Sequence, residues 1–205
     1  RSLSSAASDV YKRQMLFAVD RAGIVGADGA THSGNFDISY LRCIPNIIIM
    51  TPSNENECYQ MLKTGFNYDG ICVVRFPRGH GIGTQINKKL NLLPIGKSVK
   101  VRRGKNIAIL TFGPLLKTAF EVAEELNATL IDMRFVKPID EKMIKKCALN
   151  HNVIVTIEDN TILGGAGTAV LEVINKHNLS CKTLSLGIPD HFVCLLYTSP
   201  SPRDP

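Results

Sequence analysis

The chain has 205 residues, of which 44% are hydrophobic and 20% are charged, and its formal net charge is +6. This composition is typical of a globular protein with one large or two small domains. The basic residues are scattered, which argues against nucleic-acid binding, and no apolar run approaches the roughly 20 residues of a membrane span.

The two ends of the chain lack the pattern of its middle. DVYKRQ (residues 9–14) and CLLYTS (residues 194–199) can be encoded by one DNA segment and its reverse complement, like translated adaptors of transposase-made sequencing libraries. We therefore expect residues 1–14 and 194–205 to be non-native tails that are not part of the fold. The alternative is two natural disordered tails.

The middle of the chain alternates strand and helix patterns from Met15 onward. The first half predicts, in chain order, a strand at 16–20, a glycine-rich loop, a short helix at 36–44, a strand at 46–52, a helix up to about Asn67 and a strand at 71–76. Ser53 suits the N-cap of the longer helix, because Glu55 and Glu57 follow in its first turn. Residues 79–96 have weaker patterning and resemble a linker.

The second half repeats the alternation. It predicts strands at 106–113, 128–135, 152–159 and 181–187, and helices at 114–126, 139–149 and 164–177. Continuous β-branched strands between amphipathic helices indicate parallel sheets covered on both faces. We therefore predict an α/β protein of two three-layer parallel-sheet units, with domains at 15–90 and 91–193.

The cysteines of the middle segment form neither a CxxC motif nor a spacing with histidine that would suit a metal. An odd number of cysteines on apolar segments indicates reduced, buried thiols rather than disulfides or zinc ligands. They are Cys43, Cys58, Cys72, Cys147 and Cys181.

The loop DRAGIVGADGATHSGNFD (residues 20–37) combines glycines with titratable side chains. Arg21 follows a strand directly and could bind an anion, most simply a phosphate. His32 suits proton transfer or donation to a developing oxyanion, and Asp28 lies four residues before it. The alternative is an Arg21 that pairs with Asp20 and a surface histidine.

Two further stretches occur near predicted strand ends. RFPRG (75–79) carries two arginines that we expect on the same side of an extended chain, where one could pair with a carboxylate while the other reaches a ligand. The alternative, which is favoured if the motif stands alone, is two solvated arginines. GGAG (164–167) could bind an anion at a helix start, although tight helix–strand packing is the favoured interpretation. Glu158 and Asp159 precede it and could brace a loop or a subunit contact.

Six segments in order resemble one family. They are DRAGIVGADGATHSGNFDISYLRCIPN, MTPSNENE, RFPRG, LPIGK, DMRFVKPID and EDNTILGGAG. Together they resemble the 1-deoxy-D-xylulose-5-phosphate synthase family, which belongs to the transketolase-like, thiamine-diphosphate-dependent group. The resemblance implies that residues 15–90 are part of a pyrimidine-binding domain and residues 91–193 a truncated C-terminal domain.

The resemblance also implies a reaction, in which pyruvate condenses with D-glyceraldehyde 3-phosphate with loss of CO2. It implies catalytic roles for His32 and Asp28, and substrate binding by Arg21, Arg78 and His32. The expected cofactors are thiamine diphosphate and Mg²⁺, bound mainly by residues upstream of Met15, and no metal ligand is expected in this chain.

Several expectations depend on the resemblance alone. The catalytic glutamate and the magnesium–diphosphate motif would lie upstream of Met15, so we expect the chain to be inactive by itself. The partners implied are the two substrates and a second copy in a homodimer, in the cytoplasm of a bacterium, with a plastid origin left open. The alternatives are another transketolase-like enzyme fragment and a noncatalytic assembly module of the same fold.

Overall fold

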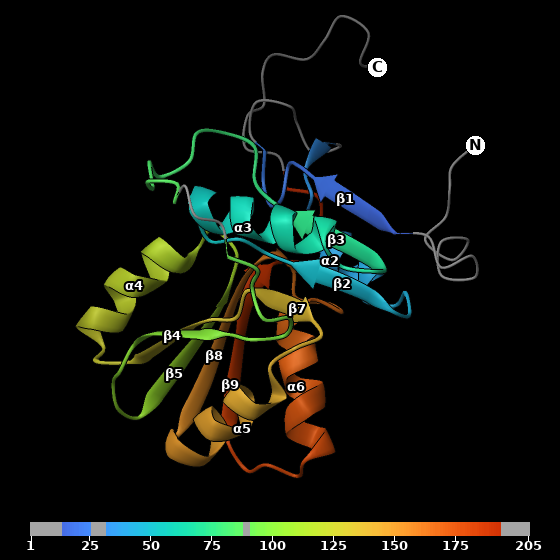
Figure 1. The fold of residues 1–205 in the computed structure, drawn as a ribbon. Coiled ribbons are helices and arrows are strands. Elements are labelled where there is room, and N and C mark those ends of the chain that lie inside the picture. The colour runs from blue at the N-terminus through green and yellow to red at the C-terminus, as the bar shows by residue number, and fades with distance from the viewer. Residues whose placement is uncertain (1–13, 26–31, 88–90, 194–205) are drawn as a thin grey trace, which may run out of the picture.

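The computed structural model describes residues 14–25, 32–87 and 91–193. They form two β-sheets with helices packed against them, one unit above the other (Figure 1). The predicted α/β architecture of two units is therefore confirmed. Apart from Gln14, the two predicted tails lie outside the described residues.

The first unit is built around a four-stranded sheet in the order β1-β3-β2-β7. Strands β1, β3 and β2 run parallel, and β2 and β3 are buried along their whole length, which explains their continuous apolar sequences. The elements of this unit before β7 are β1 (Met15–Val19), α2 (Asp37–Leu41), β2 (Ile47–Met50), α3 (Glu55–Phe66) and β3 (Ile71–Arg75).

The second unit is built around a five-stranded sheet in the order β4-β6-β5-β8-β9. Strands β6, β5, β8 and β9 are parallel. The elements of the second half of the chain are β4 (Val99–Arg102), β5 (Ile107–Phe112), α4 (Leu116–Glu125), β6 (Thr129–Asp132), β7 (Phe135–Lys137), α5 (Glu141–Asn150), β8 (Val153–Thr161), α6 (Ala166–Lys176) and β9 (Lys182–Ile188).

The stretch that we expected as one strand at 128–135 is two strands in different sheets. The backbone of Arg134 is left-handed (φ 60°), and its amide donates to the Asp132 carboxylate (3.1 Å), so the chain turns between β6 and β7. Strand β7 then pairs antiparallel with β2 of the first unit. The sequence half that forms the second unit therefore also completes the first sheet.

Each sheet is mixed rather than wholly parallel, because each has one antiparallel edge strand. In the second sheet this is β4, which pairs with β6 and was missed by the sequence interpretation. Its residues alternate between exposed and half-buried, so VKVR lacks the continuous apolar run of a central strand. An antiparallel edge strand is common on sheets that are otherwise parallel.

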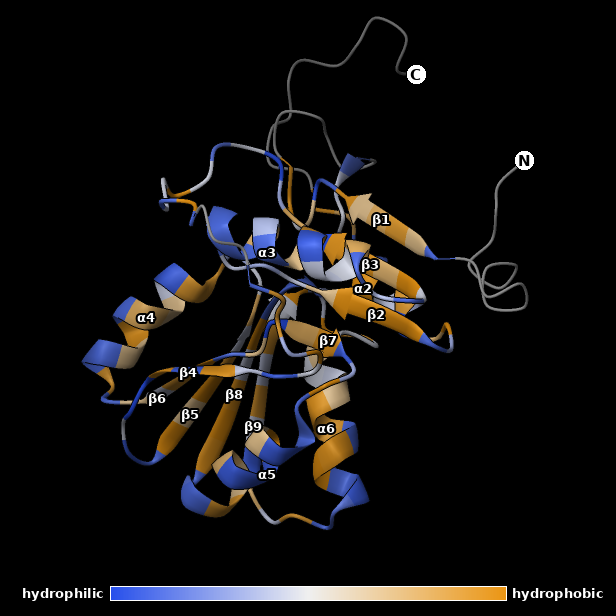
Figure 2. Cartoon of the chain, viewed as in Figure 1, coloured by the Kyte–Doolittle hydropathy of each residue, from blue (hydrophilic) through white to orange (hydrophobic). Residues whose placement is uncertain are grey.

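The layers are set by which strand residues face which helices. Helix α3 covers one face of the first sheet, where Met61 packs against Met50 and Val74. The opposite face, with Ile49 and Val73, joins the main core of the second unit. In the second unit, α5 and α6 lie on one face and α4 on the other, and Figure 2 shows the hydrophobic residues gathered in the strands between them.

Local details adjust two predictions. The N-cap of α3 is Asn54 rather than Ser53, because the Asn54 side chain accepts from the Glu57 amide (3.0 Å). The described part of the predicted linker contains no helix or strand. The five cysteines are free, as expected, but the prediction that they are buried is wrong for three of them: only Cys72 and Cys147 are buried, whereas Cys58 and Cys181 are half-buried and Cys43 is exposed. Among the described residues, no helix is long and apolar enough to cross a membrane.

Candidate functional site

The segments that carry Arg21 and Arg78 leave neighbouring parallel strands at the same sheet edge. The amide of Phe76 donates to the carbonyl of Val19 (2.9 Å), and the amide of Ala22 donates to the carbonyl of Phe76 (3.1 Å). Backbone hydrogen bonds therefore hold the two segments side by side beyond the ends of β1 and β3. This is the edge at which open α/β sheets bind ligands.

The two arginines differ in their surroundings. Arg21 has a left-handed backbone (φ 60°) and forms an ion pair with Asp20 (2.7 Å), whose side chain is 57% exposed. Arg78 follows Pro77 and is exposed. The pairing of Arg21 with Asp20 is the arrangement that we considered as the alternative to anion binding. An exposed pair of this kind is weak, so an arriving phosphate can compete for the guanidinium.

The described arms of the glycine-rich loop, residues 21–25 and 32–34, are joined at their base. The amide of Gly34 donates to the carbonyl of Arg21 (2.7 Å), and the amide of Gly23 donates to the carbonyl of Gly34 (3.1 Å). The amide of Val25 donates to the hydroxyl of Ser33 (3.1 Å). His32, which precedes Ser33 in the chain, is exposed, whereas Asp28 lies outside the described residues.

Gly34 is required at the loop base, because a side chain has no room there. A Cβ atom at this position would lie 2.5 Å from the carbonyl oxygen of Arg21. We expect Gly34→Ala to lower the free energy of unfolding by about 2–3 kcal/mol, measured by urea denaturation. Gly65→Ala is the control, because its added methyl group meets mainly the flexible end of Leu16, so a loss below about 1 kcal/mol is expected.

The prediction for Gly34 would be wrong if the two variants lost equal stability. Equal losses would mean that the loop base adjusts to the added methyl group as readily as a side chain does.

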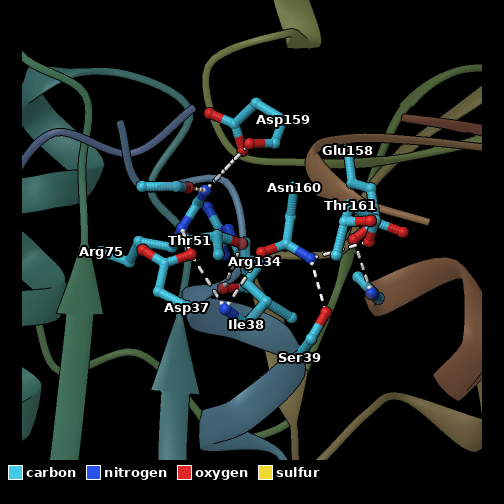
Figure 3. A network of polar contacts seen from close by, with 12 residues as sticks. Asp37, Ile38, Ser39, Thr51, Arg75, Arg134, Glu158, Asp159, Asn160 and Thr161 are labelled. Carbon is cyan, nitrogen blue, oxygen red and sulfur yellow. Dashed lines mark hydrogen bonds and ion pairs between the residues drawn. The ribbon is translucent and has the colours of Figure 1, made fainter. Parts of the chain in front are cut away.

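Arg75, at the end of β3, connects this loop to the second unit (Figure 3). It is 1% exposed, forms an ion pair with Asp159, and its Nε donates to Asp37 (2.7 Å). Its Nη2 donates to the carbonyls of Gly34 (2.8 Å) and Asp159 (3.0 Å). One arginine of RFPRG thus pairs with carboxylates, so the alternative of two solvated arginines is wrong for Arg75.

Arg75 and Arg78 do not lie on the same side of the chain, contrary to our expectation. Residues three apart in an extended segment point to opposite faces, and Pro77 lies between these two. Arg75 is therefore buried among carboxylates, while Arg78 is left at the surface.

Charges in the cluster of Arg75, Asp37 and Asp159 affect one another. Burial raises the pKa of Asp37, even though Arg75 opposes the shift. Burial by itself would lower the pKa of Arg75, but Asp159 and Asp37 outweigh this effect and raise it. The guanidinium stays charged and balances buried negative charge where the two units meet.

The GGAG stretch binds an internal carboxylate. The oxygens of Glu158 accept from the amides of Ala166 (2.6 Å) and Gly167 (2.8 Å) at the start of α6. Cβ atoms at Gly165 and Gly167 would approach Glu158 and Thr156 to 2.3 and 2.6 Å. Tight packing is therefore confirmed, and the helix-start anion site is occupied by Glu158, whose pKa burial raises to about 7.

Further side chains that the sequence interpretation missed join the two units. Arg42 donates to the carbonyls of Gly164 (2.6 Å) and Gly165 (2.9 Å), and Asn160 accepts from the Ile38 amide (3.1 Å). These pairs are more than 120 residues apart in the chain. No local pattern could have revealed them.

Two models of known families match consecutive parts of the chain. The pyrimidine-binding domain of transketolase matches residues 4–81, and the C-terminal domain of transketolase matches residues 96–194.

The chain belongs to the transketolase family.

Within this family, the chain resembles 1-deoxy-D-xylulose-5-phosphate synthases. It is 59% identical over 179 residues to the enzyme of Haemophilus influenzae (strain ATCC 51907 / DSM 11121 / KW20 / Rd), covering 87% of this chain and 28% of that protein. It is 56% identical over 185 residues to the enzyme of Escherichia coli (strain K12 / DH10B), covering 90% of this chain and 30% of that protein. The chain thus spans less than a third of the length of these relatives.

Solved structures agree on the transketolase fold. One described as "Split gene transketolase, inactive beta4 tetramer" has a TM-score of 0.76 at 24% identity, covering 91% of this chain and 64% of that one. Transketolase from Campylobacter jejuni subsp. jejuni NCTC 11168 has a TM-score of 0.67 at 16% identity, covering 92% of this chain and 29% of that one. At these identities the likeness concerns the fold alone.

The transketolase family consists of thiamine-diphosphate-dependent transferases. A magnesium–diphosphate group needs several oxygen ligands around the ion. Among the described residues, no three His, Cys, Asp or Glu side chains are grouped to hold a metal ion. The described side chains therefore do not form an all-protein cage for the ion.

Proposed function

We propose that this chain is part of a 1-deoxy-D-xylulose-5-phosphate synthase, which condenses pyruvate with D-glyceraldehyde 3-phosphate and releases CO2. The observation that carries the proposal is the 59% identity over 179 residues to a protein of that name. The arrangement of Arg21 and Arg78 at one sheet edge supports it independently, because a phosphorylated acceptor needs cationic partners there.

In this proposal, Arg21 and Arg78 bind the phosphate of the acceptor aldehyde. A phosphate dianion attracts the Arg21 guanidinium more strongly than the exposed Asp20 carboxylate does, because it carries two charges and three acceptor oxygens. His32 donates a hydrogen bond to substrate oxygen and transfers protons. Asp28 orients substrate hydroxyl groups.

Thiamine diphosphate supplies the carbanion chemistry when it is bound. We propose that it and Mg²⁺ are held mainly by residues upstream of Met15 in the longer protein, which acts as a cytoplasmic homodimer. Alone, the 205-residue chain is expected to be inactive. The split-gene transketolase described as an inactive tetramer supports the idea that part of this fold assembles without activity.

The test uses a chimera in which this chain replaces the corresponding 179 residues of the Haemophilus influenzae synthase. We expect product and CO2 from pyruvate and D-glyceraldehyde 3-phosphate. Arg21→Ala and Arg78→Ala should each raise the KM for the phosphorylated aldehyde about 10- to 100-fold, because each removes a charge-assisted hydrogen bond. The matched control is Arg103→Ala, which removes an exposed arginine on the second unit.

Unphosphorylated D-glyceraldehyde makes the test specific. With this acceptor the two arginine variants should match the unmodified chimera, because the interaction that they lose is absent. Equal losses with both aldehydes would contradict the phosphate roles. Activity with a ketose donor but not with pyruvate would favour another transketolase-like enzyme, and no activity with either would favour a noncatalytic module.

A further inference from the structure

The base of the glycine-rich loop and the second unit meet at one buried arginine. The Gly34 carbonyl accepts from the Gly23 amide (3.1 Å) and from Arg75 Nη2 (2.8 Å). The Gly34 amide closes the loop base by donating to the Arg21 carbonyl (2.7 Å). Arg75 therefore binds the atom that joins the two arms of the loop.

Asp159 contacts the same base from β8. Gly23 has a left-handed backbone (φ 73°), and a Cβ atom there would lie 3.1 Å from Cβ and 3.2 Å from Oδ2 of Asp159. The side chain of Asp159 thus packs against one arm of the loop while it pairs with Arg75. Figure 3 shows Asp159 and Asp37 reaching Arg75 from opposite directions.

The contacts of Arg75 define its orientation. Its Nε and both Nη atoms have partners, on two segments that are far apart in the chain, residues 34–37 and Asp159. Without the Asp159 carboxylate, Nη1 would lose its partner, and the guanidinium would be held toward the Gly34 carbonyl only by its bonds to Asp37 and to main-chain carbonyls. The left-handed conformations of Arg21 and Gly23 would then lose a contact that holds them.

We propose that Asp159, acting through Arg75, positions the loop arms at 21–25 and 32–34. The second unit, to which Asp159 belongs, thereby sets the geometry of the acceptor-phosphate site. The proposal rests on the proposed function for the identity of that site. The contact between Asp159 and the loop base does not depend on it. Asp159 is a positioning residue, because it acts on Arg21 only through Arg75 and Gly23.

The first test measures amide hydrogen exchange on the 205-residue chain with Asp159→Asn. The asparagine keeps the size and an acceptor oxygen but removes the charge, so the chain should still fold. We expect the amides of Ala22, Gly23 and Gly34 to exchange at least about tenfold faster, while the amides of β5 keep their rates.

The matched control is Glu158→Gln, one residue away on β8. It weakens the start of α6 but forms no hydrogen bond or ion pair with Arg75 or with the described arms of the loop, so the amides of Ala166 and Gly167 should respond and the loop amides should not. Unchanged loop amides in Asp159→Asn, or equal acceleration in both variants, would overturn the proposal.

The second test places Asp159→Asn in the chimera. We expect the KM for D-glyceraldehyde 3-phosphate to rise about tenfold with kcat within about twofold, and kinetics with unphosphorylated D-glyceraldehyde to stay unchanged. A loss of kcat that is equal for both acceptors would mean general destabilisation and overturn the positioning role. If Arg21→Ala itself had no effect, the phosphate site would be wrong, while the exchange result would still test the contact.

Discussion

Replacing Arg75 by methionine is expected to lower the free energy of unfolding by about 3–5 kcal/mol, because it leaves the buried Asp37 carboxylate and the half-buried Asp159 carboxylate without their cation. Arg75 is 1% exposed and is the largest of the fully buried side chains. Its loss also removes a donor from the carbonyls of Gly34 and Asp159. The measurement is the urea-denaturation midpoint of the 205-residue chain at pH 7.

The control for Arg75→Met removes the unpaired charges as well. Combining it with Asp37→Asn and Asp159→Asn should recover a large part of the lost stability, because neutral amides cost less to bury than carboxylates. Arg75→Met alone could fail to fold, and the triple variant keeps the prediction testable in that case. A triple variant no more stable than Arg75→Met would show that the lost hydrogen bonds and packing, rather than the uncompensated charge, cause the destabilisation.

A second large effect is expected on the pH dependence of stability. It comes from Asp132, which is buried where α3 meets the turn between β6 and β7. Glu57, also buried, forms an ion pair with Arg134 and accepts from the Ser53 hydroxyl (3.1 Å). Burial raises the pKa of Asp132 to about 7, and the neighbouring Glu57 carboxylate adds to the rise, while Ser53 and Arg134 oppose it. Two carboxylates and one guanidinium thus share this space, so one carboxyl group keeps its proton up to near neutral pH.

The direction of the pH dependence follows from proton binding. In the unfolded chain Asp132 loses its proton near pH 4, whereas in the folded chain it keeps the proton until about pH 7. The folded state therefore binds more protons between these values. The contribution of Asp132 to the free energy of unfolding is largest below pH 4 and falls by on the order of 2–4 kcal/mol as pH rises to 7.

Asp132→Asn should reduce this decline and make the chain more stable than the unmodified one at pH 8. The asparagine still accepts from the Arg134 amide, and its NH₂ group donates as the protonated acid does. Some decline should remain, because burial also raises the pKa of Glu158 to about 7. Urea denaturation at several pH values between 4 and 8 measures the effect.

The control is Asp69→Asn, which removes an acidic charge at an exposed position. It should leave the slope of stability against pH as it is in the unmodified chain. If Asp132→Asn had the same slope as this control, the pKa of Asp132 would not be raised in the folded chain, and the prediction would be wrong.

The sequence by itself determined the two-unit α/β architecture. Runs such as IIIM and IAILTF have the continuous apolar pattern of strands buried on both faces, and amphipathic helices separate them. It also favoured tight packing of GGAG, and it left carboxylate pairing of one RFPRG arginine open as one of two possibilities. Those predictions needed only local chemistry, because charge, glycine content and periodicity are readable within a few residues.

The tertiary structure decided what depends on distant partners. The division of DMRFVK between two sheets, the pairing of Arg75 with Asp159 and the capping of α6 by Glu158 all depend on where the second unit packs. Burial makes these contacts strong, because a charged group removed from water needs a partner, and which partner it finds is set by the packing of the two units. The sequence showed where charged residues and glycines occur, and the packing of the two units determined which of them contact one another.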